Sequence, residues 1–137
     1  MLLTSPWLSV FADTAATRKE KCRLAVIGPG SRGRFLMNFL VQNPKVEIAA
    51  LHVIYQPSID EALKIAPQAK VVSDYRKILE DKTIDAVVVA VPLNKHFQIV
   101  MDAFDAGKHV FCEKPLALNL ADAREMLEAV KKANVRH

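Results

Sequence analysis

The stretch CRLAVIGPGSRGRFLMNFL, residues 22–40, decides the fold of this chain. An apolar run rich in branched residues is followed by Gly28, Gly30 and Gly33, and then by apolar residues at helical spacing. A G-x-G-x-x-G between a strand and a helix lets the backbone turn sharply and approach a pyrophosphate closely. The phosphates then meet free N–H groups at the positive end of the helix dipole. The stretch therefore predicts a strand–turn–helix unit that binds a dinucleotide.

The rest of the chain repeats this alternation of strand and helix. Short apolar segments predict strands at 22–27, 46–53, 70–72, 85–91 and 108–114. Amphipathic segments predict helices at 31–43, 58–66, 74–81, 94–107 and 119–134. In the first of these helices we assign Phe35, Met37 and Phe39 to the core. Five strands alternating with five helices favour an α/β fold, a doubly wound parallel sheet of Rossmann-like type, over residues 21–137.

Several helix ends carry capping signals. Ser58 and Glu61 have the spacing of a capping box, and Asn94 is placed to cap the helix that follows it. Asp74 and Asn119 are predicted to be N-caps in the same way.

Length, composition and charge exclude several classes of protein. With 137 residues, 51% of them hydrophobic and 25% charged, the chain is sized for one globular domain. No uninterrupted apolar run reaches about 18 residues, so no membrane span is predicted. The net charge of +4 is scattered along the chain, which argues against a nucleic-acid partner. Cys22 and Cys112 fall at opposite edges of the predicted sheet, and no His/Cys cluster accompanies them, so neither a disulfide nor a metal site is expected.

The first twenty residues stand apart from this pattern. They begin apolar, are broken by Pro6, and then become small and polar. Val10 to Ala12, before Asp13, has the character of a signal cleavage site, although no basic segment precedes it. We interpret residues 1–20 as an N-terminal arm or the remnant of an export signal, which favours a periplasmic or exported location over the cytoplasm.

The acid that usually accompanies such a glycine motif is missing. An Asp or Glu is expected about 20 residues later, where it holds the ribose hydroxyls. Val53 stands there, between His52 and Ile54, and no arginine follows to accept a 2′-phosphate. His52 is the polar candidate for the adenosine end. NAD and NADP both stay open, with NAD the favoured of the two.

A second group of residues leaves the fourth and fifth predicted strands. Ala90 and Pro92 follow the fourth strand, and Glu113 and Lys114 end the fifth. The carboxyl ends of parallel strands meet at one edge of a sheet, where ligands bind. A lysine beside a nicotinamide can hold a substrate oxygen, or move a proton when burial lowers its pKa.

Three motifs carry a resemblance to a known family: GPGSRG at 28–33, VAVPLNKH at 89–96 and AGKHVFCEKPLAL at 106–118. They resemble the N-terminal domain of the Gfo/Idh/MocA family of glucose–fructose oxidoreductases and inositol dehydrogenases. The resemblance implies a nicotinamide-dependent oxidoreductase of sugars, polyols or related carbonyl compounds, with Lys114 as the catalytic lysine. It implies cofactor contacts from Gly28, Pro29, Gly30, Ser31, Arg32, Gly33, Ala90, Pro92, His96 and Glu113.

The sequence also departs from the family pattern. Members usually show Thr-Pro-Asn where this chain has Val91, Pro92 and Leu93, which removes two polar side chains. The family's second α/β domain, which supplies a further catalytic histidine or acid, is not among these 137 residues. We therefore expect this chain to bind cofactor with little turnover by itself, and the full-length protein to be a homo-oligomer.

Three functions are compatible with these observations. The first is the NAD(P)-binding domain of an oxidoreductase that acts on a carbohydrate-like small molecule. The second is the cofactor domain of a nicotinamide-dependent glycoside hydrolase of the same family. The third is a non-catalytic nucleotide-binding module.

Overall fold

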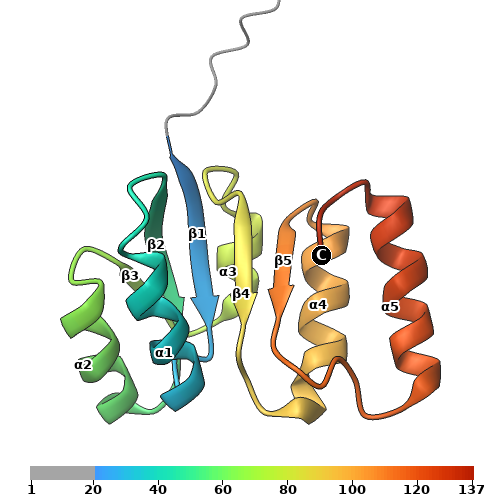
Figure 1. Ribbon diagram of the computed structural model, residues 1–137, viewed down its shortest axis with the longest axis horizontal. Coiled ribbons are helices and arrows are strands. Elements are labelled where there is room, and N and C mark those ends of the chain that lie inside the picture. The colour runs from blue at the N-terminus through green and yellow to red at the C-terminus, as the bar shows by residue number, and fades with distance from the viewer. Residues whose placement is uncertain (1–20) are drawn as a thin grey trace, which may run out of the picture.

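Five parallel strands form one sheet in the computed structural model, which describes residues 21–137 (Figure 1). Their order across the sheet is β3-β2-β1-β4-β5. The strands are β1 Cys22–Ile27, β2 Val46–His52, β3 Lys70–Val72, β4 Ala86–Val89 and β5 His109–Cys112. The helices are α1 Ser31–Leu40, α2 Gln56–Ile65, α3 Tyr75–Glu80, α4 His96–Asp105 and α5 Leu120–Ala133, with a 3₁₀ turn at Leu93–Lys95. This order confirms the predicted doubly wound sheet; the predicted arm, residues 1–20, lies outside the described residues.

Two separate cores lie on the two faces of the sheet. On one face, Met37 of α1 and Ala62 of α2 belong to a core with Leu24 and Val26 of β1 and with residues 48 and 51 of β2. On the other, helices α3, α4 and α5 pack against the residues between them, such as Ala25 and Ile27 of β1. The helices change from one face of the sheet to the other because the chain passes from β3, at one edge of the sheet, to β4, on the far side of β1. Right-handed crossovers then place the later helices on the opposite face.

The core assignment of the first helix is right for one residue and wrong for two. Met37 is fully buried, whereas Phe35 and Phe39 are 50% and 59% exposed. Their rings contact each other edge-on, 5.0 Å between centroids. Phe39 borders an apolar hollow of about 310 Å³ in front of β4 and β5. The helices that follow β4 and β5 lie on the other face, so within residues 21–137 no helix covers the hollow.

Two of the four predicted helix caps are wrong. α2 starts at Gln56, two residues ahead of the expected cap, because Pro57 occupies its first turn, where a fixed φ favours helix initiation. Asn94 lies inside the 3₁₀ turn and makes no cap for α4. Asp74 and Asn119 are confirmed, since their side chains accept hydrogen bonds from the backbone N–H groups of Arg76 and Asp122, respectively.

The structure also bears on the cysteines, on membrane spans and on metal sites. Cys22 and Cys112 open β1 and close β5, and the two form no disulfide with each other. No helix within residues 21–137 has the length and apolar character needed to cross a membrane. The same residues bring together no group of His, Cys, Asp or Glu suited to a metal ion.

Candidate cofactor site

The carboxyl ends of the strands meet at the lower edge of the sheet in Figure 1, and the motifs singled out in the sequence follow them there. We call residues 28–33, which follow β1 and include the first residues of α1, the glycine turn. We call residues 90–96 and 113–115, which follow β4 and β5, the polar loops. The two regions lie next to each other because β1 pairs with β4, and β4 with β5.

Two glycines of the glycine turn are required by the protein's own packing. Gly28 has φ +89°, and a Cβ there would lie 2.7 Å from Val91 Cγ1 and 2.9 Å from the carbonyl oxygen of Ala90. A Cβ on Gly33 would lie 2.6 Å from the carbonyl oxygen of Gly28. These contacts allow β1, α1 and the start of the polar loops to pack backbone against backbone, as the motif predicts.

Gly30 is different, because no contact within residues 21–137 requires a glycine there. Its φ of −69° and ψ of −162° are open to any residue, and a Cβ there would have no atom within 4 Å. The open space lies at the N-terminus of α1, whose first turn contains no acid. A pyrophosphate can approach the backbone here without meeting a side chain or a negative charge. The glycine turn therefore fits the cofactor that the sequence predicts.

The polar loops are organised around Glu113, which is 7% exposed. Its carboxylate accepts a hydrogen bond from Nε of Arg32 at 2.6 Å and another from the backbone N–H of Lys114 at 3.1 Å. The hydrogen bond from Arg32 is the main cause that holds the pKa of Glu113 below its usual value. Glu113 thus connects the first turn of α1 to the backbone of the predicted catalytic lysine.

A hollow of about 440 Å³ opens beside this ion pair. It is lined by Arg32, Ala90, Val91, Leu93, His96, Glu113 and Lys114. Five predicted site residues thus meet in one place although they come from three separate segments. The Lys114 residue is exposed at this hollow, and the aliphatic side chains of Val91 and Leu93 stand where the family pattern has polar ones.

His96 holds the two polar loops together. The residue is 2% exposed, and its ring nitrogens lie 3.0 Å from the carbonyl oxygens of Val91 and Pro115. Cys112 Sγ lies 3.4 Å from Nδ1 of the same ring. Burial raises the pKa of the Cys112 thiol to about 11. The thiol therefore stays protonated at neutral pH and does not act as a thiolate nucleophile.

At the adenosine end, the structure places Val53, half-buried, where the acid is usual. The predicted candidate His52 accepts the N–H of Gly28 on its carbonyl oxygen, at 2.9 Å. Its ring faces away from the glycine turn: Nδ1 lies 3.2 Å from the carbonyl oxygen of Val72, and the ring contacts Tyr75 edge-on. The side chain of His52 is therefore not brought together with the other predicted residues.

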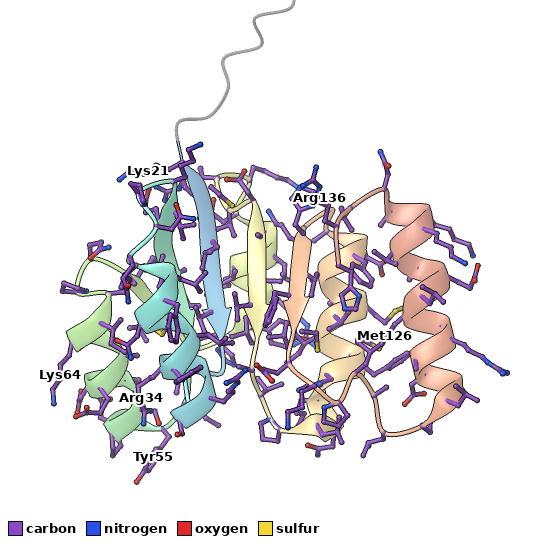
Figure 2. The ribbon with its side chains drawn as sticks, viewed as in Figure 1. Lys21, Arg34, Tyr55, Lys64, Met126 and Arg136 are labelled. Carbon is purple, nitrogen blue, oxygen red and sulfur yellow. The ribbon has the colours of Figure 1, made fainter. Side chains whose placement is uncertain are left out.

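Sequence reasoning left Arg34, which follows the glycine turn, out of the predicted site. Its Nη1 donates to the carbonyl oxygen of Pro29 at 3.1 Å and lies 3.5 Å from Oγ of Ser58. Figure 2 shows it between α1 and α2, at the same edge of the sheet as Tyr55. The sequence contained one indication of its role, because the arginine directly follows the third glycine. Only the packing of α1 beside α2 shows which groups its side chain contacts.

Comparison with known proteins agrees with this geometry. A profile of the Gfo/Idh/MocA family, described as an oxidoreductase family with an NAD-binding Rossmann fold, matches residues 22–137. Myo-inositol 2-dehydrogenase of Thermotoga maritima is 36% identical over 82% of this chain and 34% of that protein. The structure of GenD2 from gentamicin A biosynthesis in complex with NAD is 28% identical, with a TM-score of 0.79 over 85% of this chain and 33% of that one. KijD10, a 3-ketoreductase from Actinomadura kijaniata in complex with NADP and TDP-benzene, is 25% identical, with a TM-score of 0.77 over 84% of this chain and 35% of that one.

A parallel sheet with a glycine turn at its carboxyl edge is the arrangement of a dinucleotide-binding domain. The chain belongs to the Gfo/Idh/MocA family, as its NAD-binding Rossmann domain. It spans about a third of the length of the relatives it matches.

Proposed function

We propose that this chain binds the cofactor and provides the catalytic lysine of an enzyme that moves hydride between NAD or NADP and a carbon of a sugar, inositol or related polyol. The observation that carries the proposal is the position of Lys114, at the rim of the hollow where Glu113 and Arg32 connect the two strand ends. Support for the substrate class comes from the inositol dehydrogenase among the relatives.

The residues of this chain have separate tasks in that reaction. The glycine turn holds the pyrophosphate in the open space beside Gly30, at the N-terminus of α1, and the polar loops border the nicotinamide. The nicotinamide, when bound, gives or takes the hydride. Nζ of Lys114 binds the oxygen on the reacting carbon; in oxidation, the neutral amine takes the proton of that hydroxyl as the C–H hydride leaves, and in reduction the ammonium returns it.

Cofactor binding is tested on the 137-residue chain itself by titration with NADH and NADPH, followed by fluorescence. We expect saturable binding of at least one of them, and Gly30→Val abolishes it because the new side chain fills the space of the pyrophosphate. The thermal midpoint of Gly30→Val stays at the wild-type value, since no protein atom lies within 4 Å of its Cβ. Absence of binding to the wild-type chain, or undiminished binding to the variant, contradicts the proposal.

The role of Lys114 is tested in a longer protein that carries this chain and the rest of the enzyme. Lys114→Ala is expected to lower kcat for inositol or sugar oxidation about 10²- to 10⁴-fold, the range typical of a proton-transfer group. Cofactor affinity changes little, and Lys114→Arg keeps the charge without restoring the rate. Turnover of aryl glycosides without net oxidation or reduction would instead point to a glycoside hydrolase.

A further inference from the structure

The loop after β2 carries no negative charge that opposes a phosphate. The usual carboxylate binds both ribose hydroxyls of NAD and repels the 2′-phosphate of NADP. Here Val53 takes its place, and the next two residues, Ile54 and Tyr55, are 87% and 65% exposed. The first acid in α2 is Asp60, whose carboxylate accepts a hydrogen bond from Gln56. Discrimination against NADP by this loop is therefore lost.

Of the two arginines that follow Gly30, only one is matched by a carboxylate. Arg32 is paired with Glu113 at 2.6 Å. Arg34, which is half-buried, has hydrogen bonds within the described residues to two neutral oxygens, those of Pro29 and Ser58. Its positive charge is thus held between the glycine turn and the first turn of α2 without a negative partner in contact.

The acid on α2 whose charge interacts with this arginine has a partner of its own. Glu61, one turn after Ser58 on α2, pairs with Lys64 at 2.5 Å. The hydrogen bond from Lys64 is the main cause that lowers the pKa of Glu61, and the charge of Arg34 contributes less. The positive charge of Arg34 therefore stays available for an anionic ligand.

We propose that Arg34 and Ser58 bind the 2′-phosphate of NADP(H), so that this domain selects NADP(H) over NAD(H). The inference rests on the proposed cofactor-binding function and names the form of cofactor. The guanidinium donates two N–H groups to the phosphate oxygens, and the Ser58 hydroxyl donates a third hydrogen bond. Arg34 is well placed for this contact because its bond to Pro29 ties it to the turn that holds the pyrophosphate.

The test compares four ligands on the full 137-residue chain: NADPH, NADH, 2′,5′-ADP and 5′-ADP. NADPH is expected to bind about 10- to 100-fold more tightly than NADH, the value of a few hydrogen bonds to a charged group. The fragment 2′,5′-ADP is expected to bind more tightly than 5′-ADP for the same reason. Arg34→Ala removes this preference and leaves the affinity for NADH within about threefold, and Ser58→Ala reduces the preference by less.

Two further variants separate recognition from bulk charge and from folding. Arg34→Lys keeps the charge without the two-pronged geometry and retains part of the preference. Arg124→Ala removes one positive charge from an exposed residue of α5, beyond the other face of the sheet, and leaves both affinities unchanged. The inference alone is overturned if the wild-type chain binds NADH as tightly as NADPH or more tightly. It is also overturned if a folded Arg34→Ala loses affinity for both cofactors equally. Failure of the wild-type chain to bind either cofactor overturns the proposed function with it.

Discussion

The glycine turn is made of backbone, whereas the polar loops are made of side chains. In the turn, Gly28 and Gly33 permit contacts between main-chain atoms that any Cβ would obstruct. In the loops, Glu113 and His96 are buried polar side chains that bond to Arg32 and to backbone groups on both loops. Two neighbouring halves of one site are thus stabilised by different physical effects.

The difference determines how each half responds to substitution. Close backbone packing tolerates no added atom, because the opposing main chain cannot rotate away as a side chain can. A hydrogen-bonded side chain is sensitive to removal, because a buried carbonyl or charge is then left without a partner. Added atoms should therefore damage the glycine turn most, and removed side-chain groups should damage the polar loops most.

Gly28→Ala is expected to be the most damaging single change. The residue has φ +89°, and the added methyl would meet the backbone of Ala90 at 2.9 Å and Val91 Cγ1 at 2.7 Å. Backbone strain of about 1–3 kcal/mol adds to overpacking of about 1–3 kcal/mol. We expect urea unfolding to show a loss of about 3 kcal/mol.

Gly30→Ala is the matched control for that change. It adds the same methyl two residues away, at an ordinary φ and with open space around it, and leaves stability within about 0.5 kcal/mol. Equal losses in the two variants would show that the glycine turn is not organised by close backbone packing.

This contrast explains what could be predicted from the sequence. Glycine spacing and branched runs depend on backbone geometry, which repeats across folds, so the sheet and the glycine turn were predicted correctly. Phe35 and Phe39 were misassigned because helical spacing shows which residues share a side, not whether another element covers that side. Arg34 was left out of the predicted site because its reach to Ser58 depends on how α1 and α2 pack.

His96→Phe tests the polar loops by removing one side chain and filling its space. A neutral imidazole has one N–H, so the carbonyl oxygen of either Val91 or Pro115 would lose its donor, at an expected cost of about 2 kcal/mol. Hydrogen exchange is expected to quicken at residues 91–96 and 113–116 before it quickens in β1. His96→Gln, which keeps one donor group, restores part of the protection. Unchanged exchange in the polar loops of His96→Phe would contradict the role of this side chain as their connection.

The role of His96 also shows where sequence interpretation ends. The resemblance predicts that this histidine contacts the cofactor, whereas the structure has both ring nitrogens beside protein carbonyls. The link between Arg32 and Glu113 joins positions 81 residues apart, and no local pattern predicts it. Such contacts follow only from the order of the strands, which brings the ends of β1, β4 and β5 together.

Glu113→Gln is expected to have a smaller effect than His96→Phe, and one that depends on pH. Arg32 is 53% exposed at its side chain, so solvent screens the ion pair, and its loss should cost only about 1 kcal/mol at neutral pH. Arg32 and the Lys114 N–H hold the pKa of Glu113 below its ordinary value of 4.5. A carboxyl group with a lowered folded-state pKa stabilises the protein above its unfolded-state pKa, and this contribution is lost as pH falls through the folded-state value.

The stability difference between wild type and Glu113→Gln should therefore be constant from about pH 7 to about pH 5, and shrink below pH 4.5 as the wild-type carboxylate takes up a proton. Urea unfolding at several pH values measures it, and Arg32→Gln is the matched control, because it removes the same pair from the other side and should show the same pH dependence. If the stability difference between the two proteins stayed the same in acid, the glutamine would destabilise the protein through its packing and not through the lost charge. The polar loops would then resemble the glycine turn in depending on packing, and the contrast between the two halves would not hold.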